Sequence, residues 1–516
     1  MTLDAVAREV MAHAFAGVAE EMGLVLIHSA VSPNIRERRD ASAALFDAAG
    51  DMIAQAAHIP VHLGALADAV RAVRAQHPQP GELYILNDPY AGGSHLPDLT
   101  LIGVIRTVDG IGGYSVVRAH HSDVGGATPG SMPAGARELF AEGVVLPPVL
   151  LTPEVERLVL ANVRTPETRR ADLAAQKAAV ERGAEGMWSL AARHGWAFLH
   201  EAGRALMDDA ERRARATLSR LPLGSEGPAV ATDFLEGDGI TDSDIPIRVA
   251  VTLEDGCLHT DFTGTAPAVP GNVNCPLAVT NAAVLFVVQT ILGEGVPMNA
   301  GVARTVRVTA PEGCLVNVHW PHAVAAGNVE TSQRIADTVF RALAAGGVAV
   351  PAQGQGTMNN VTLGAPGWTY YETLGGGQGA GPRGAGASGV HVGMSNTRNT
   401  PIEVLEMECP VRVREYALRA ASGGAGRWRG GAGVVREIEL LVPAEASILS
   451  ERRRHPPRGS AGGGDGSCGI NLKNGTPIPA KANVSLAAGD VLRIETPGGG
   501  GWGHEDHEPT ATRRGT

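Results

Sequence analysis

The pattern of hydrophobic and polar positions predicts that helices and strands are mixed along this chain. Near the N-terminus, apolar residues recur at near-helical spacing between Val6 and Met22, which predicts an amphipathic first helix with Thr2 as its cap. Other short segments alternate in polarity or run apolar in the manner of strands. Before residue 150 these segments are "ELYILND", "LTLIGVIRTV" and "GYSVVRAHH".

Beyond residue 150 the pattern changes twice. Residues 152–220 carry Ala, Leu and Arg at helical spacing, which predicts a largely helical segment. From about residue 228, strand-like runs separated by Asp-Gly turns predict a β-meander, and helical patterns return at 278–293 and 329–346. After residue 350 the chain is rich in glycine and strand-like.

These patterns predict a mixed α/β (α+β) fold built as a large multi-layered body. Its N-terminal α/β region is expected to carry a metal site, its central part helices, and its C-terminal part Gly-rich strands. The predicted regions are 1–150 (N-terminal α/β metal-site region), 151–227 (helical segment), 228–350 (β-meander and helices), 351–504 (Gly-rich and β-rich) and 505–516 (a disordered tail).

Composition narrows the class of protein. The 516 residues are 44% hydrophobic and carry a formal net charge of -11, with one short basic run at 451–458. Nucleic acid is therefore not expected as a partner, because phosphate binding needs a concentrated basic face. The longest apolar stretch, at 276–292, is interrupted by Thr, Asn and Gln, so it predicts a buried helix and no membrane span. Five dispersed cysteines without a C-x-x-C pair, and a start without signal-peptide features, predict a cytoplasmic protein.

The most informative stretches are "NDPYAGGSHLPD" (87–98) and "AHHSDVGG" (119–126), which share the spacing His-x-x-Asp. Pro97 discourages a helix, so His95 and Asp98 are expected in a loop that leaves a strand. The alternation before the second motif puts His120 at a strand end, with His121 on the opposite face. Two imidazoles and several carboxylates suit a divalent ion such as Mn²⁺ or Zn²⁺, whereas the alternative is a set of hydrogen-bonded turns.

Other polar groups are weaker candidates. His58 and His62 have i, i+4 spacing, but Pro60 between them disfavours a regular helix, so a role in a substrate pocket competes with structural packing. Arg427 and Arg429 flank a tryptophan in a Gly-rich stretch and either hold an anionic carboxylate or are solvated turn residues.

Nucleotide-binding and nucleophile motifs are missing from the sequence. The chain has no Gly-Lys dipeptide, so no P-loop is predicted, and its glycines are expected to form tight turns and close backbone approaches. No G-x-S-x-G motif occurs, which favours a metal-activated water over a serine nucleophile.

Nine phrases, taken together and in order, resemble the hydantoinase B/oxoprolinase family. This family comprises the B subunits of ATP-dependent N-methylhydantoinases, 5-oxoprolinases and caprolactamases, and is related to subunits of acetone and acetophenone carboxylases. The resemblance covers nearly the whole chain to about residue 503. The phrases are "SPNIRERRDASAALFD", "HIPVHLG", "NDPYAGGSHLPDLTLIGVI", "AHHSDVGGATPGSMP", "GNVNCPLAVTNA", "AAGNVETSQRIAD", "NTRNTPIEVLE", "SGGAGRWRGGAG" and "TPGGGGWG".

The resemblance implies a metal site and a place for it in a reaction. Its metal ligands map onto Asp40, His95, Asp98 and His120, and the ion is expected to be Mn, Zn or Mg. Asp123 and His121 are then candidates to orient a ligand or to accept a proton. The carboxylase relatives draw more ligands from the second motif, which leaves Asp123 open as a ligand.

The family also implies a partner. In this family the A subunit, which is an actin-like ATPase, binds ATP and phosphorylates the carbonyl oxygen of a cyclic amide such as a lactam, a hydantoin or 5-oxoproline. This chain, which binds no ATP itself, would then be the B subunit of a hetero-oligomer and complete the hydrolysis with water activated by its metal. The alternatives are a subunit of an acetone- or acetophenone-type carboxylase, and a non-catalytic scaffold for the A subunit.

Overall fold

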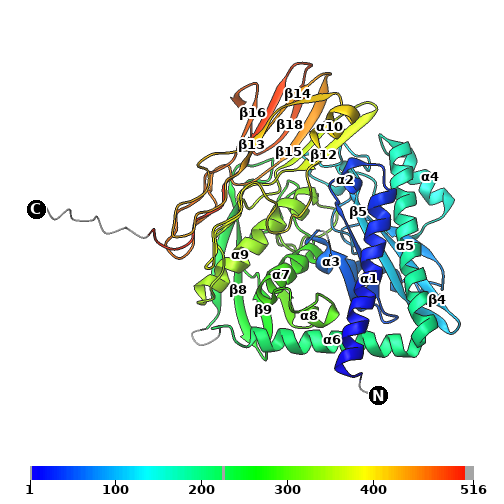
Figure 1. Ribbon diagram of the computed structural model, residues 1–516. Coiled ribbons are helices and arrows are strands. Elements are labelled where there is room, and N and C mark those ends of the chain that lie inside the picture. Colours follow the sequence, from blue (N-terminus) through cyan, green and yellow to red (C-terminus); the bar gives the residue numbers. More distant parts are fainter. Residues whose placement is uncertain (1–2, 58, 224–226, 506–516) are drawn as a thin grey trace, which may run out of the picture.

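A six-stranded antiparallel sheet organises the first part of the molecule (Figure 1). The computed structural model describes residues 3–57, 59–223 and 227–505. The expected tail from residue 506 onward therefore lies outside the described residues, as do the Thr2 cap and His58. The strand order is β2-β1-β5-β4-β3-β6. The strands are β1 (Ala41–Phe46), β2 (Met52–Ala57), β3 (Leu83–Leu86), β4 (Asp98–Thr107), β5 (Gly110–His120) and β6 (Val149–Leu150).

Helices cover both faces of this sheet because its strands are apolar on both sides. Along β1, Ala43 and Leu45 belong to the core formed with α1 (Ala5–Ser29), whereas Ala44 and Phe46 belong to the core formed with α3 (His62–Arg74). Successive side chains of a strand point to opposite faces, so this strand is buried throughout. The remaining elements of this part are α2 (Pro33–Arg36), the short 3-10 turn η1 (Leu139–Ala141), α4 (Pro153–Ala161), α5 (Pro166–His194) and α6 (Trp196–Leu218).

Helix α1 is half-buried and capped by Asp4, whose carboxylate accepts a hydrogen bond from the backbone N–H of Ala7. Its buried face starts at Met11, so Val6 and Val10 are exposed, contrary to the predicted apolar stripe. Among the described helices, α1 alone is long and apolar enough to cross a membrane by length and composition. Buried core helices pass the same test, and α1 contributes residues to the core over the sheet.

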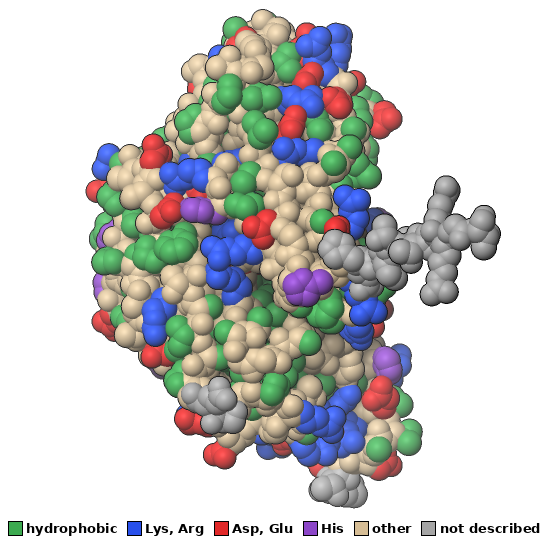
Figure 2. Space-filling model, turned by 90° about the vertical axis from the view of Figure 1, so that its left-hand side faces the viewer, with side chains coloured by type: hydrophobic (Ala, Val, Ile, Leu, Met, Phe, Trp, Pro, Cys, Tyr) green, Lys and Arg blue, Asp and Glu red, His purple; other side chains and the backbone are tan. Residues whose placement is uncertain are grey.

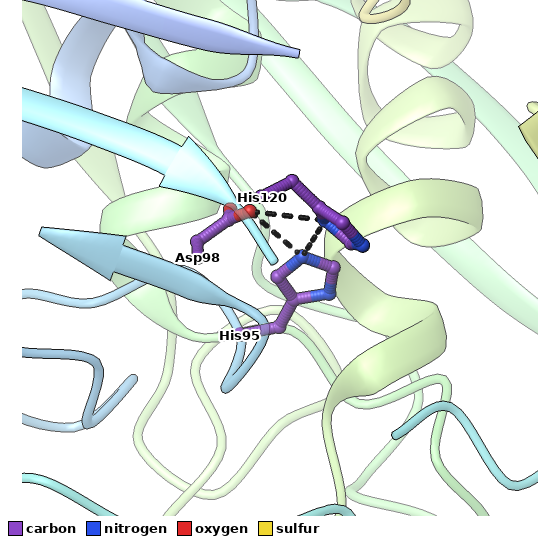
Figure 3. A group of neighbouring side chains, drawn as sticks. All are labelled: His95, Asp98 and His120. Atoms are coloured by element: carbon purple, nitrogen blue, oxygen red, sulfur yellow. Dashed lines mark hydrogen bonds and ion pairs between the residues drawn. The ribbon is translucent and has the colours of Figure 1, made fainter. Parts of the chain in front are cut away.

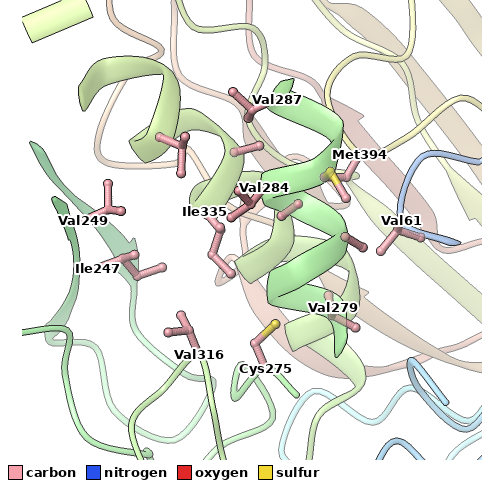
Figure 4. Close-up of a cluster of buried hydrophobic side chains, with 14 of the residues drawn as sticks. Val61, Ile247, Val249, Cys275, Val279, Val284, Val287, Val316, Ile335 and Met394 are labelled. Atoms are coloured by element: carbon pink, nitrogen blue, oxygen red, sulfur yellow. The ribbon is translucent and has the colours of Figure 1, made fainter. Parts of the chain in front are cut away.

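The middle of the chain forms the predicted meander and a helical core. Strands β7 (Ala229–Glu236), β8 (Asp244–Glu254) and β9 (Cys257–Asp261) pair antiparallel, and β10 (Val306–Thr309) adds in parallel to β9. The predicted buried helix is α7 (Leu277–Leu292), whose valines pack between the meander and neighbouring segments (Figure 4). The other elements here are α8 (Ala300–Ala303), the π-helical turn η2 (Gly327–Thr331) and α9 (Ser332–Ala345).

The C-terminal part contains two antiparallel sheets that share a core of their own. Val361 and Ile448 come from the four-stranded sheet β12-β11-β15-β18, and Ile438 and Ile494 from the five-stranded sheet β13-β14-β19-β16-β17. The elements are β11 (Asn360–Ala365), β12 (Trp368–Thr373), α10 (Ile402–Glu408), β13 (Val411–Leu418), β14 (Val434–Leu440), β15 (Ala444–Leu449), β16 (Ile470–Lys473), β17 (Thr476–Pro477), β18 (Lys481–Leu486) and β19 (Val491–Glu495). The mixed α/β fold is confirmed, whereas the exact region boundaries stay a prediction.

The Gly-rich stretches form a bundle of extended segments rather than the predicted strands (Figure 1). The backbone N–H of Gly499 donates to the carbonyl of Gly431, that of Gly500 to Gln353, and that of Gly501 to Gly464. Three successive residues thus bond to three different segments, whereas a β-strand has only two neighbours. This threefold pattern is that of polyproline II, which has three residues per turn and no internal hydrogen bonds.

Glycine is required in this glycine bundle because the segments pack backbone to backbone. A Cβ placed on Gly431 would overlap the carbonyl oxygen of Ala387, and one on Gly499 would overlap that of Gln378. The expected close backbone approaches are therefore present. Sequence reading took these stretches for strands because both conformations are extended.

We predict that Gly431→Ala destabilises the protein strongly, because the clash is with backbone that cannot turn away. Overpacking of this kind costs about 1–3 kcal/mol or more. The matched control is Gly384→Ala in another Gly-rich stretch, where a Cβ meets nothing within 4 Å. Urea unfolding of both variants measures the difference, and equal midpoints for the two would contradict the proposed packing.

Candidate metal centre

Strand pairing brings the predicted ligands together at one end of the large sheet. Asp98, the first residue of β4, lies opposite His120, the last residue of β5, in the antiparallel register. The backbone N–H of His120 in turn donates to the carbonyl of Asp40, which directly precedes β1. Asp40, Asp98 and His120 thus lie at the same end of three neighbouring strands, β1, β4 and β5. His95 comes from the loop before β4.

His95, Asp98 and His120 converge on one point (Figure 3). His95 Nε2 lies 3.1 Å from Asp98 Oδ1 and 3.2 Å from His120 Nδ1, and His120 Nδ1 lies 3.2 Å from the same Asp98 oxygen. Ligand atoms around a tetrahedral ion at about 2.1 Å are roughly 3.4 Å apart. Among the described residues, these three side chains form the group of His, Cys, Asp or Glu whose ligand atoms lie close enough together to hold a metal ion.

Asp98 is held in place by partners that leave one oxygen to the imidazoles. Ser94 Oγ donates to its Oδ2, and His62 Nε2 lies 3.4 Å from the same oxygen. Although burial alone would raise the pKa of Asp98, His95, His120 and His62 lower it well below the usual value. Asp98 is therefore a carboxylate, the form that binds a cation.

The two imidazoles differ in charge preference. Burial would lower the pKa of His95, but the adjacent Asp98 carboxylate raises it, whereas burial lowers the pKa of His120. His95 Nδ1 and His120 Nε2, the ring nitrogens facing away from Asp98, are buried and have no hydrogen-bond partner among the described residues. The three atoms that do converge, Asp98 Oδ1, His95 Nε2 and His120 Nδ1, form a buried donor set that fits a divalent ion accepting both imidazole and carboxylate ligands.

Asp40 stands beside the three converging side chains rather than within them. It is 6% exposed, and its negative charge acts to raise the pKa of both His95 and His120. The sheet register therefore brings Asp40 into electrostatic reach of the site, and its role as a fourth ligand stays a prediction.

His121 and Asp123 are not brought to this point. His121 faces the opposite side of β5, as predicted, where its Nε2 bonds Gln176 of α5. Burial and the charge of Arg169 lower the pKa of His121 to about 4. Asp123 binds Arg164 and loop N–H groups with both oxygens, at 2.9–3.2 Å. Their catalytic roles stay predictions that this geometry does not support.

The weaker candidates lie in two different places. His62 is buried at the start of α3, accepts or donates a bond with Ser42 Oγ at 2.9 Å, and touches Asp98. These contacts favour a role in holding the Asp98 carboxylate, and a place for His62 in a substrate pocket stays a prediction. Arg427 and Arg429 are exposed in the glycine bundle, with Arg427 over the Trp428 ring, so an anion-binding role for them stays a prediction.

Sequence reading missed two residues that surround the site. Tyr371 of β12 stacks on His120 with ring centroids 4.2 Å apart, and Arg38 donates to its carbonyl oxygen. Glu142 is fully buried and accepts hydrogen bonds from the N–H groups at 324 and 325, and burial raises its pKa to about 7. Its charge acts on His95. Neither residue stands in a His-x-x-Asp motif, and Tyr371 lies about 250 positions from the ligand it touches.

Comparison with known proteins places this fold and site in one class. A solved ATP-dependent caprolactamase from Pseudomonas jessenii matches with a TM-score of 0.91 and 26% identity, over 98% of this chain and 92% of that one. An acetone carboxylase matches in fold alone, with a TM-score of 0.85 and 17% identity over 96% of this chain and 75% of that one. The class is thus a large α/β protein of the caprolactamase fold.

Sequence relatives narrow the class to a family. The chain is 38% identical to 5-oxoprolinase 1 of Arabidopsis thaliana and 30% identical to the B subunit of a putative D-/L-hydantoinase of Pseudomonas sp.. It covers 91% of the latter but only 42% of the former. The hydantoinase B/oxoprolinase family model matches residues 4–505. The chain belongs to the hydantoinase B/oxoprolinase family, which confirms the resemblance seen in the sequence.

We predict that the double variant His95→Ala/His120→Ala loses its metal, because two of the three converging donors disappear. Elemental analysis after gel filtration should show about one divalent ion per wild-type chain and roughly a tenth of that or less in the variant. The control is His13→Ala/His77→Ala, which removes two exposed imidazoles. A stoichiometric ion in the double variant would place the site elsewhere.

We also predict that His62→Ala weakens metal binding without abolishing it. Loss of a residue that orients a ligand typically lowers metal affinity about 10- to 100-fold. Competition with a chromophoric chelator measures the change. Ser42→Ala, which removes only the partner of His62, should have a smaller effect. An unchanged affinity in His62→Ala would show that Asp98 needs no such support.

Proposed function

We propose that the chain is the B subunit of an ATP-dependent cyclic amide hydrolase and carries its metal centre. The observation that supports this most directly is the buried His95–Asp98–His120 group, in which two imidazole nitrogens and one carboxylate oxygen lie 3.1–3.2 Å from one another. Family membership and the caprolactamase and 5-oxoprolinase relatives support the reaction type.

The residues would divide the work of holding the ion. Asp98, His95 and His120 would bind it, with Asp40 as a fourth ligand, while His62 and Ser94 fix the Asp98 carboxylate. When bound, such an ion supplies Lewis acidity and lowers the pKa of a coordinated water to about 7. Imidazole ligands favour Zn²⁺ or Mn²⁺ over Mg²⁺. Burial of all three donors, each 2% exposed or less, keeps bulk water from competing for the ion.

A partner is expected because amide resonance must be overcome before water can attack. In the proposal, the partner is an A subunit, an actin-like ATPase that binds ATP and phosphorylates the carbonyl oxygen of the cyclic amide. The chain spans about four tenths of the 5-oxoprolinase relatives but nine tenths of the hydantoinase relative. These lengths support a division between separate subunits in some members and one long chain in others. We therefore propose a hetero-oligomer, located in the cytoplasm.

Figure 2 shows one face, on which Lys and Arg stand in small groups among Asp and Glu rather than as one basic surface. The view gives no support for nucleic acid as a partner on this face.

We predict that the purified, metal-loaded chain with ATP does not hydrolyse 5-oxoproline, caprolactam or a hydantoin. Turnover should start when the A subunit is added, and should be lost again with His95→Ala/His120→Ala in the complex. Ring opening and phosphate release are followed together. Turnover by the chain alone would overturn the proposed division of labour.

Two other functions stay open to the same assay. The fold shared with acetone carboxylase makes a subunit of a carboxylase the second candidate. Incorporation of labelled bicarbonate into a ketone, without ring opening of any amide, would assign that activity. A scaffold role would be assigned if the metal-free double variant supported full activity of the complex.

A further inference from the structure

A small polar cavity lies directly behind the metal centre. Its volume is about 130 Å³, and its walls come from α2, the segment that follows β5, the start of α5, β12 and the end of α10. Liquid water occupies about 30 Å³ per molecule, so the cavity has room for a group of at least roughly four or five heavy atoms. Its lining includes the polar residues Ser32, Asn34, Ser122, Arg169, Tyr370 and Tyr371.

The cavity shares a wall with the candidate metal ligands. Tyr371 lines it and stacks on His120. Asn34 also lines it, and its Nδ2 donates to the carbonyl oxygen of His120 at 2.7 Å. Ser122 follows His120 by two residues and receives a hydrogen bond from Arg169 Nη1 at 2.6 Å. The two sites are thus back to back across the end of β5.

The N-terminus of a long helix opens into this cavity. Helix α5 runs for 29 residues from Pro166, and its cap residue Thr165 makes no side-chain capping bond. Thr165, Thr168 and Arg169 all line the cavity. The first N–H groups of a helix have no intrahelical partner, and together they carry about half a positive charge, which favours an anion.

Buried side chains of the cavity add unused hydrogen-bond donors. Ser32 Oγ, Thr165 Oγ1 and Arg169 Nε are buried and have no hydrogen-bond partner among the described residues, and residues Ser32 and Arg169 are each 1% exposed. Buried polar atoms are rarely left without a partner. Hydroxyl and guanidinium groups that converge in this way suit an oxygen-rich ligand.

The buried charge of Arg169 lies near two carboxylates, those of Asp172 and Asp123. Its Nη2 pairs with Asp172 Oδ2 at 3.0 Å, but the other oxygen of Asp172 also accepts the N–H groups of Val31 and Ser32, both at 3.1 Å. Asp172 thus accepts hydrogen bonds from three donors, and Asp123 is paired with Arg164, so neither carboxylate serves Arg169 alone. At the solvent side of the cavity, the exposed Glu408 adds a negative charge to the lining.

We infer that this cavity is a binding site for a small oxyanion of phosphate size. Arg169 and the first turn of α5 bind the oxygens, and Ser32 and Thr165 donate further hydrogen bonds. If the proposed function holds, the ligand is the phosphate that leaves when the activated cyclic amide is hydrolysed. If the chain is instead a carboxylase subunit, the ligand of this cavity is bicarbonate. The link to the reaction rests on the proposed function, but binding of the ion does not.

The test uses the full chain and inorganic phosphate, titrated calorimetrically at low ionic strength. It is done in the His95→Ala/His120→Ala background, so that phosphate cannot bind to a metal. Saturable binding at one site per chain is expected. Bicarbonate is titrated in parallel. If it binds more tightly than phosphate, the site stands and its ligand is bicarbonate.

Two variants change the expected affinity in opposite directions. Arg169→Gln should weaken phosphate binding at least about tenfold, because a charge-assisted donor is lost. Glu408→Gln should strengthen it about twofold to fivefold, because a like charge leaves the mouth. The matched control is Glu403→Gln, an exposed acid of the same helix α10 that does not line the cavity.

The exposed Glu408 variant decides the matter if Arg169→Gln fails to fold. Absence of saturable binding to either ion, or equal affinities in Glu408→Gln, Glu403→Gln and the parent, would overturn the oxyanion site. Absence of cyclic amide turnover by the wild-type chain with an A subunit, together with saturable phosphate binding, would instead count against the proposed function alone.

Discussion

The antiparallel register of β4 and β5 is the constraint on which the candidate site depends. It sets Asp98 opposite His120 and keeps both on the α3 face, where His62 begins its helix. A shift of one residue would turn either side chain to the other face of the sheet. The short contacts between His95, Asp98 and His120 therefore depend on the buried pairing of two long strands. A loop alone would not hold them so firmly.

The site is completed by parts of the chain that lie far away in sequence. Arg38, fully buried, donates to the carbonyl of Tyr371 and to the hydroxyls of Thr373 and Thr397, and so ties the segment before β1 to the C-terminal sheets. A buried guanidinium left without these acceptors would be costly, so the two parts are held in one arrangement. The same contact keeps the Tyr371 ring on His120, at the wall shared with the oxyanion cavity.

Much of this could be predicted from the sequence, because it depends on local patterns. The helices of 152–220, the meander and the buried helix α7 follow from periodicity and Asp-Gly turns, and the repeated His-x-x-Asp spacing points to His95, Asp98 and His120. Tyr371 and Glu142 could not be found in this way, since only tertiary packing brings them to the site. Asp123 and His121 matched a motif, yet the loop and α5 use their polar atoms. The exposure of Val6 and Val10 reflects where packing starts, which periodicity does not reveal.

The glycine bundle has a consequence for how the chain is made. It joins backbone segments from across the last 150 residues, because Gly499, Gly500 and Gly501 bond to segments around residues 353, 431 and 464. Contacts between such distant residues form slowly, because loop closure must come before any gain in bonding. During synthesis the bundle must wait for its final segment to leave the ribosome, and the earlier segments expose unpaired amides until then. Until the segment at 499–501 has joined the glycine bundle, the nascent chain is therefore exposed to aggregation.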